Sequence, residues 1–265
     1  MNGSEDKYLL YLDILGFSEM VKDSERVFFL YKIINALNVH SHDVFECIVF
    51  SDTLIVYNRE DPKSDRDRRY LVMFLIEFAQ DLLCRLIGRD TYFRAVLTKG
   101  SFWHDQMDNL DSYFGDALVR AHRDEKKLIG CGLFIDRRLN KYNRIFDTAK
   151  HCADYDYVFV TQNIQRASEY GREGFPFPGE ILDLAAMNFA TYAELVFLQD
   201  IYRNSVSHEN PKVRGKFQAT WVHYQQQYKE LCDVLYAADF DFDAVTKANW
   251  QEAKDFFEKG LASQS

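Results

Sequence analysis

The segment YLLYLDILGFSEMV, residues 8–21, determines the predicted fold. An apolar run, Tyr8–Leu12, ends in a single acid, Asp13, and Gly16 follows three residues later. A run this apolar is typical of a strand that is buried on both faces of a sheet. An acid at its end is either a cap or turn residue, or a ligand for something bound at the edge of the sheet.

Length and charge limit the class of protein. The 265 residues are 47% hydrophobic, enough for one large domain or for a domain with an extension. The net charge of −9 argues against non-specific binding to nucleic acid or to an anionic membrane, although it leaves room for a small basic pocket. Five scattered cysteines without CxxC spacing predict a reduced, cytoplasmic protein. The longest apolar stretch, Tyr70–Gly88, contains three charged residues, which predicts a core helix and no membrane span.

The order of elements predicts an α+β fold. Strands are expected at 8–12, 45–50, 53–57, 92–98, 133–135 and 157–161, and helices after Asp23-Ser24, at 70–87 and at 116–127. This is the ferredoxin-like order βαββαβ. After about residue 185, aromatic residues recur at helical spacing, so a mainly helical C-terminal extension is expected.

Two acids are expected to meet at one edge of this sheet. Asp13 ends the first strand, and Asp52 lies on the tight turn between residues 45–50 and 53–57. We expect the first strand to lie beside the strand that follows the first helix. Adjacent carboxylates repel each other unless a cation lies between them, and Mg²⁺ or Mn²⁺ suits such an oxygen site. The main-chain N–H groups of residues 14–17 are expected to face an anion. Taken singly, each acid also fits a structural cap or turn.

Four segments in the same order carry a resemblance to a known family. They are Leu12-Asp13-Ile14-Leu15-Gly16-Phe17, Phe50-Ser51-Asp52, Phe93-Arg94-Ala95-Val96-Leu97 with Gly100, and Tyr113-Phe114-Gly115-Asp116 through Ala121-His122-Arg123. Over residues 7–165 the chain resembles the class III nucleotidyl cyclases, the fold of adenylate and guanylate cyclases. The resemblance implies a catalytic domain at 1–165 and a mainly helical extension at 166–265.

The resemblance also implies a mechanism. Asp13, Ile14 and Asp52 would form a site for two divalent cations, Mn²⁺ or Mg²⁺. The triphosphate would lie against Ile14, Leu15, Gly16 and Phe17. Arg123 falls where the family places a transition-state arginine, and catalytic sites would be shared between the subunits of a homodimer.

Departures from the family point to the substrate. Positions where purine cyclases place base-reading or ribose-orienting residues are here Ile48, Ser112 and Val119. The pattern is more similar to the bacterial antiphage pyrimidine cyclases, which make cyclic UMP or cyclic CMP as a second messenger for a separate effector protein. Phe50 would then stack on the base, and Arg94 would donate to a carbonyl oxygen, which favours UTP slightly over CTP.

Each of these residues also has a structural interpretation. Phe50 fits a core aromatic, Arg94 fits a buried ion pair as well as it fits a ligand contact, and Arg123 fits a solvated helix face. The alternative function is a catalytically inactive, cyclase-like module that binds a nucleotide or senses a partner. A polymerase-like diguanylate cyclase is disfavoured, because the hairpin lacks the Gly-Gly-Asp/Glu pattern.

Overall fold

The computed structural model describes residues 2–184 and 188–262 and divides into two compact units. The first unit comprises Met1–Arg85 and Tyr92–Val160, and the second comprises Leu86–Thr91 and Thr161–Ser265. The predicted functional division into 1–165 and 166–265 stays a prediction.

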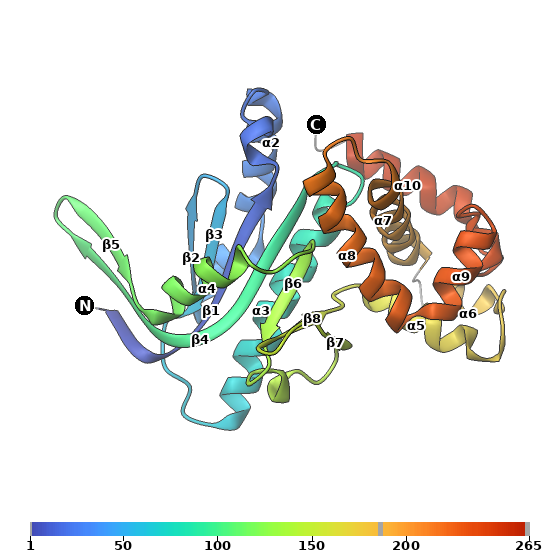
Figure 1. The fold of residues 1–265 in the computed structure, drawn as a ribbon. Coiled ribbons are helices and arrows are strands. Elements are labelled where there is room, and N and C mark those ends of the chain that lie inside the picture. Colours follow the sequence, from blue (N-terminus) through green and yellow to red (C-terminus); the bar gives the residue numbers. More distant parts are fainter. Residues whose placement is uncertain (1, 185–187, 263–265) are drawn as a thin grey trace. The chain divides into compact units, whose positions relative to one another are not determined.

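An eight-stranded sheet forms the centre of the first unit, in the order β2-β3-β1-β4-β6-β8-β7, with β5 paired to β4 (Figure 1). The strands are β1 Asn2–Leu15, β2 Phe45–Phe50, β3 Thr53–Asn58, β4 Tyr92–Met107, β5 Leu110–Phe114, β6 Gly132–Asp136, β7 Thr148–Lys150 and β8 Tyr155–Val158. Residues 8–12 of β1 are at most 6% exposed, which confirms a strand buried on both faces.

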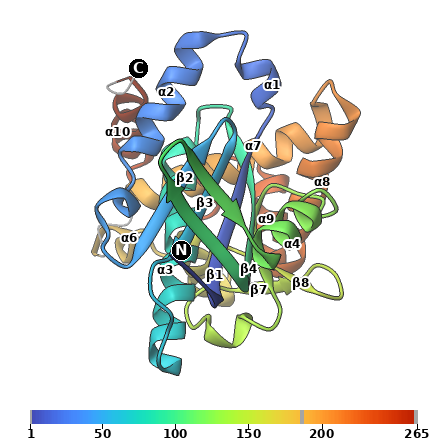
Figure 2. The ribbon, with the colours of Figure 1, turned by 90° about the vertical axis from the view of Figure 1, so that its left-hand side faces the viewer.

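Helices cover both faces of this sheet. Figures 1 and 2 show α2 (Ser24–Asn35) and α3 (Asp65–Leu86) on one face and α4 (Asp116–Glu125) on the other. The short helix α1 (Phe17–Met20) follows β1 directly. Short 3-10 turns lie at Asn38–Ser41 and Asn140–Tyr142. The chain order β1-α2-β2-β3-α3-β4 confirms the predicted ferredoxin-like βαββαβ core.

One expectation about this sheet is wrong. The strand beside β1 is not β2, the strand that follows the first helix. Both neighbours of β1, β3 and β4, run antiparallel to it, and β2 lies at the edge next to β3. In this topology the β2–β3 hairpin folds back so that its second strand pairs with β1. The turn of the hairpin therefore still lies beside the end of β1.

The β4–β5 hairpin extends well beyond the predicted strand at 92–98. β4 continues to Met107, and β5 returns antiparallel to it (Figure 1). Gly115 ends the return with a φ of 147° and precedes α4. A Cβ atom at this position would lie 2.2 Å from the Ser101 carbonyl oxygen, so only glycine fits between the β4–β5 hairpin and α4.

The second unit is helical in its described part, which confirms the predicted character of the C-terminal region. Its helices are α5 Gln162–Tyr170, α6 Glu180–Leu184, α7 Asn188–Ser207, α8 Pro211–Gln227, α9 Lys229–Ala237 and α10 Trp250–Ala262, with 3-10 turns at Gly171–Glu173 and Phe242–Ala244. Residues 185–187 and 263–265 of the predicted extension lie outside the described residues. None of the described helices has the length and apolar character needed to cross a membrane.

Candidate functional site

Asp13 and Asp52 lie at the same edge of the sheet. Asp13 pairs with Thr53 in the β1–β3 register, and Asp52 is the residue before Thr53. The Ile14 N–H donates to the Asp52 carbonyl oxygen at 2.9 Å, so the turn is bonded to the residue that follows Asp13. Both acids are half-buried. The sequence predicted that they would meet, although it assigned the wrong neighbouring strand.

The carboxylates of Asp13 and Asp52 both act on the Tyr11 hydroxyl. Burial is the main cause that raises the pKa of Tyr11, and the carboxylates of Asp13, Glu125 and Asp52 raise it further. The Tyr11 hydroxyl also shares a hydrogen bond of 3.4 Å with Thr53 Oγ1. Both carboxylates therefore act on the electrostatic environment of the same hydroxyl.

The turn that presents Asp52 is held in an unusual conformation. Ser51 has a φ of 55°, a left-handed conformation that is uncommon outside glycine. The Tyr31 hydroxyl of α2 donates to the Ser51 carbonyl oxygen at 3.0 Å. This contact from a neighbouring helix fixes the turn, and with it the position of Asp52.

The segment 14–17 is placed differently from the expected row of anion-binding N–H groups. The Ile14 N–H is already bonded to Asp52, so Ile14 can offer only its main-chain oxygen to a metal. Gly16 adopts a φ of 79° and its carbonyl oxygen accepts from Glu19 and Met20, which starts α1. The side chain of Phe17 is buried and that of Leu15 is half-buried. A phosphate contact at 15–17 stays a prediction.

Phe50 is 78% exposed at the end of β2, immediately before the turn. The core interpretation of this aromatic is therefore wrong. An aromatic ring left in solvent two residues from Asp52 is available as a stacking surface.

Arg94 is engaged inside the protein. It lies directly opposite Asp13 in the β1–β4 register and is buried. Its Nε donates to Glu125 Oε1 at 2.6 Å, its Nη2 donates to the same oxygen, and its Nη1 donates to the Leu128 carbonyl oxygen at 2.8 Å. Of the two interpretations, the structure contains the buried ion pair, and a contact to a base stays a prediction.

Arg123 lies near the C-terminal end of α4 with its side chain 57% exposed. Its Nε and Nη2 donate to the two carboxylate oxygens of Asp124 at 2.9 and 3.3 Å. The Tyr155 hydroxyl of β8 donates to Asp124 at 3.0 Å. Burial raises the pKa of Asp124, but the hydrogen bonds from Arg123 and Tyr155 outweigh it and the pKa is lowered. Asp124 thus orients Arg123, and a hydrogen bond from Tyr155 of β8 holds Asp124 in place.

The donor set at the edge fits hard divalent cations. Across residues 2–184 and 188–262, no group of three or more His, Cys, Asp or Glu side chains is arranged for a metal. Two carboxylates and a main-chain oxygen, with water and substrate phosphates completing the shell, suit Mg²⁺ or Mn²⁺. The same set is too small and too oxygen-rich for a structural zinc site.

Several residues around this site were not predicted. Tyr11 and Tyr31 read as core aromatics in the sequence, and Asp124 and Glu125 stand within a charged run, His122–Lys127. Tyr155 lies 31 residues from Asp124, its hydrogen-bond partner. A sequence pattern contains no signal for a contact of this kind, since it depends on how β8 aligns with β6.

No known family profile matches the sequence, and no curated protein does. The fold is similar to the adenylyl cyclase CyaB from P. aeruginosa, at 12% identity and a TM-score of 0.45, over 60% of this chain and 96% of that one. It is also similar to the guanylyl cyclase domain of the RhoGC fusion protein from Blastocladiella emersonii, at 15% identity and a TM-score of 0.47, over 60% and 97%. Similarity at this level describes the fold alone.

Proposed function

We propose that this chain is a nucleotidyl cyclase that converts UTP or CTP to the 3′,5′-cyclic monophosphate and pyrophosphate. The observation that carries the proposal is the junction of β1 with the β2–β3 turn. There the Ile14 N–H···O hydrogen bond to Asp52 keeps two carboxylates at one edge of the sheet. Two half-buried carboxylates at one edge of the sheet offer the oxygen ligands that a hard divalent cation prefers.

The chain's own residues have distinct roles in this reaction. Asp13 and Asp52 would hold two divalent cations, which when bound lower the pKa of the ribose 3′ hydroxyl and bind the triphosphate. The 3′ oxygen loses its proton to water and forms a bond to the α-phosphorus, while the bond to the pyrophosphate oxygen breaks. Arg123 would neutralise the charge that develops on the transferring phosphoryl group.

The base is a pyrimidine in this proposal. Phe50 offers an exposed ring beside the turn. Of the three positions that depart from the purine cyclases, Ile48 and Val119 are apolar and have no polar group to bind a purine nucleotide. The Ser112 hydroxyl donates within the β4–β5 hairpin, to the Asp105 carbonyl oxygen at 3.3 Å. The slight preference for UTP depended on Arg94 as a free donor. Because Glu125 and Leu128 occupy that guanidinium, the proposal covers both pyrimidines.

The assembly in this proposal is a homodimer. Arg123 hydrogen-bonds Asp124, and its exposed side chain is available to a second copy of the chain. Each site would then take its metal acids from one subunit and its arginine from the other. A role in antiphage defence, with a separate effector activated by the cyclic product in the cytoplasm, belongs to the same proposal and rests on the resemblance in sequence.

One experiment tests the reaction and the base together. Purified protein is incubated separately with ATP, GTP, CTP and UTP, with Mn²⁺ and then Mg²⁺, and the products are identified by mass spectrometry. A cyclic pyrimidine monophosphate supports the proposal. A cyclic purine would contradict the base assignment only. No cyclic product from folded, dimeric protein that still binds nucleotide would favour the inactive binding module.

A further inference from the structure

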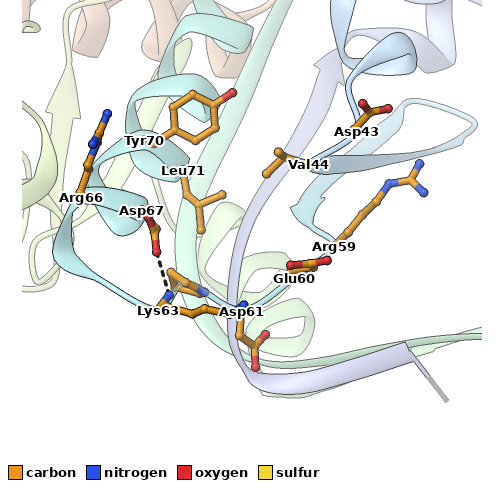
Figure 3. A pocket seen from close by; sticks show the side chains of 11 residues that line it. Asp43, Val44, Arg59, Glu60, Asp61, Lys63, Arg66, Asp67, Tyr70 and Leu71 are labelled. Atoms are coloured by element: carbon orange, nitrogen blue, oxygen red, sulfur yellow. Dashed lines mark hydrogen bonds between the residues drawn. The ribbon is translucent and has the colours of Figure 1, made fainter.

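A cavity of about 660 Å³ lies at the opposite end of the β2–β3 hairpin from Asp52. It is bounded by the residues before β2, the loop 59–64 after β3 and the first turns of α3 (Figure 3). Volumes of roughly 300–1,000 Å³ are usual for small-molecule sites. A six-residue strand spans about 20 Å at about 3.3 Å per residue, so this cavity is separate from the candidate cyclase site.

Opposite charges line the two sides of the cavity. Figure 3 shows Lys63 and Arg66 on the side of the loop and α3, and Asp43 and Glu60 on the side of the strands. Within the described part of the chain, none of these four charged groups has a hydrogen bond or an ion pair at its side chain. Two cations therefore face two carboxylates across a space that they leave open.

The other charged groups of the lining already have partners. Asp67 accepts from the main-chain N–H groups of Lys63 and Ser64, both at 2.9 Å. Asp61 accepts from Ser4 and lies 3.4 Å from the Lys7 ammonium. Arg59 donates to the Phe45 carbonyl oxygen at 2.9 Å. Two cations and two carboxylates of the lining, Lys63, Arg66, Asp43 and Glu60, therefore remain for a ligand.

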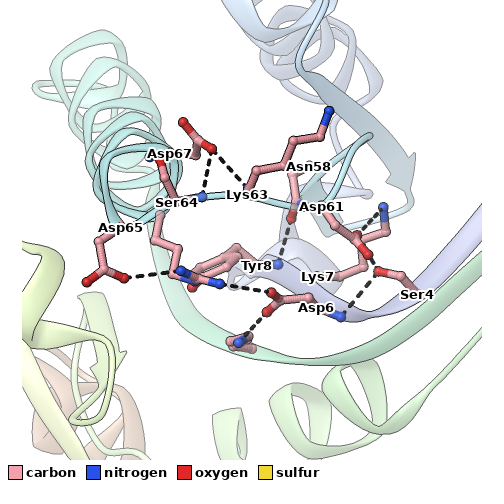
Figure 4. Close-up of polar contacts among 12 residues, drawn as sticks. Ser4, Asp6, Lys7, Tyr8, Asn58, Asp61, Lys63, Ser64, Asp65 and Asp67 are labelled. Carbon is pink, nitrogen blue, oxygen red and sulfur yellow. Dashed lines mark hydrogen bonds and ion pairs between the residues drawn. The ribbon is translucent and has the colours of Figure 1, made fainter.

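Hydrogen bonds fix the conformation of the loop 59–64 in the absence of a ligand. The Asn58 side chain accepts from the Tyr8 N–H at 2.6 Å (Figure 4). It also donates to the Glu60 carbonyl oxygen at 2.7 Å. The buried Lys7 ammonium donates to the Arg59 carbonyl oxygen at 2.6 Å. A preformed site loses little conformational entropy when a ligand binds.

An aromatic surface completes the cavity. Tyr70 is 46% exposed, and its hydroxyl is hydrogen-bonded to His42 Nε2 at 2.8 Å, which fixes the ring. Val44 and Leu71 add apolar surface to the same lining. A ligand that fits therefore has a flat ring as well as an anionic end and a hydrogen-bond-donating end.

We propose that this cavity binds a nucleotide whose base carries an exocyclic amino group. The phosphate would lie at Lys63 and Arg66, the base against Tyr70, and the amino group would donate to Asp43 or Glu60. A simple anion is disfavoured, because the two carboxylates would repel it. A base with a carbonyl oxygen in place of the amino group would bind more weakly, because the carbonyl oxygen and the carboxylates are both hydrogen-bond acceptors.

CMP and UMP form the matched pair of probes, since they differ chiefly in an amino group against a carbonyl oxygen. Binding to the full chain is measured by titration calorimetry in EDTA, which removes divalent cations, with inorganic phosphate as a third probe. A hydrogen bond to a charged group contributes about 1.5–3 kcal/mol, so CMP should bind at least about 10-fold more tightly than UMP. Phosphate should bind more weakly than CMP.

Variants assign the binding to the cavity. Lys63→Glu with Arg66→Glu, and separately Asp43→Asn with Glu60→Gln, should each weaken CMP binding at least about 10-fold. Asp52→Ala and the exposed control Lys212→Glu should leave it unchanged. Equal affinities for CMP and UMP, no binding in EDTA, or loss of binding in Asp52→Ala would each overturn the proposal. The measurement requires no turnover, so an inactive cyclase that still binds CMP here would contradict the proposed reaction alone.

Discussion

Asp52 differs from most turn acids because a second carboxylate lies at the next strand end. In the proposed site both carboxylates would hold the cation, so binding of the metal should stabilise the folded protein. We predict that Asp52→Asn abolishes cyclisation. We also predict that Mn²⁺ raises the melting temperature of the wild type but not that of this variant. Activity assays and thermal melts with and without Mn²⁺ provide the test, with Glu209→Gln as an exposed control. A variant that keeps both responses would contradict the metal assignment.

Phe50 gives a prediction about the base. Because its side chain is 78% exposed, its removal should leave the free energy of unfolding nearly unchanged. Stacking of a base on an aromatic ring contributes about 1–3 kcal/mol, so Phe50→Ala should raise KM for the nucleotide roughly 5- to 150-fold. Phe50→Tyr should retain most of the affinity. The matched control is Phe28→Ala, at another aromatic position that is 69% exposed. An unchanged KM in Phe50→Ala would remove this residue from the site.

Helix α4 and strand β8 are connected through Arg123, Asp124 and Tyr155. An exposed ion pair contributes up to about 1 kcal/mol, so Asp124→Asn should lower kcat about fivefold if the pair only orients Arg123. KM should stay within about twofold, because the arginine is proposed to act on transition-state charge. Tyr155→Phe should have a smaller effect in the same direction. Asp233→Asn, which removes another exposed pair, is the control. A fall in the melting temperature of Asp124→Asn that accompanies the fall in kcat would indicate a purely structural role.

In the second unit, Glu194 of α7 accepts from the Ile164 N–H at 2.9 Å and from Asn163 Nδ2 at 2.7 Å, at the start of α5. Burial raises the pKa of Glu194 from 4.5 to about 7. The raised value means that the folded state binds this proton more tightly than the unfolded state does. The contribution of Glu194 to stability is therefore complete below about pH 4.5 and is lost as the pH rises through about 7.

Glu194→Gln should remove this pH dependence. The free energy of unfolding of the wild type, relative to the variant, should fall by about 3 kcal/mol between pH 4.5 and pH 8. Urea unfolding of both proteins across this range measures the difference, and Glu209→Gln serves as the control. Parallel curves for wild type and Glu194→Gln would show that the carboxyl does not titrate on unfolding.

The elements that could be predicted from sequence are those with buried periodic patterns. Tyr8–Leu12 and the helix around Tyr70–Ile87 were predictable because burial of both faces or of one stripe constrains the residue types. The extended β4–β5 hairpin could not be predicted in this way. Met107 and Leu110 at its end are exposed, so the sequence there has no alternation of buried and exposed residue types. The engagement of Arg94 could not be predicted either. Its partner Glu125 lies 31 residues away, and the pair depends on how α4 packs on β4.

The proposed site requires two copies of the chain. Asp13 and Asp52 belong to one edge of the sheet, whereas the described polar partner of Arg123 is Asp124. If each site combines the acids of one subunit with the arginine of the other, Asp13→Ala and Arg123→Ala destroy different halves. A heterodimer of the two variants then contains one site with both substitutions and one intact site.

Mixing the two inactive variants should therefore restore activity. With complete random exchange, half of the dimers are heterodimers and each has one intact site, so activity should reach about a quarter of the wild-type value on statistical grounds. Subunit exchange is checked by energy transfer between labelled chains, and Asp13→Ala mixed with Asp52→Ala is the negative control because both substitutions damage the same half. No recovery in exchanged mixtures would mean that each chain carries its own complete site, and Arg123 would then have to reach the acids within one subunit.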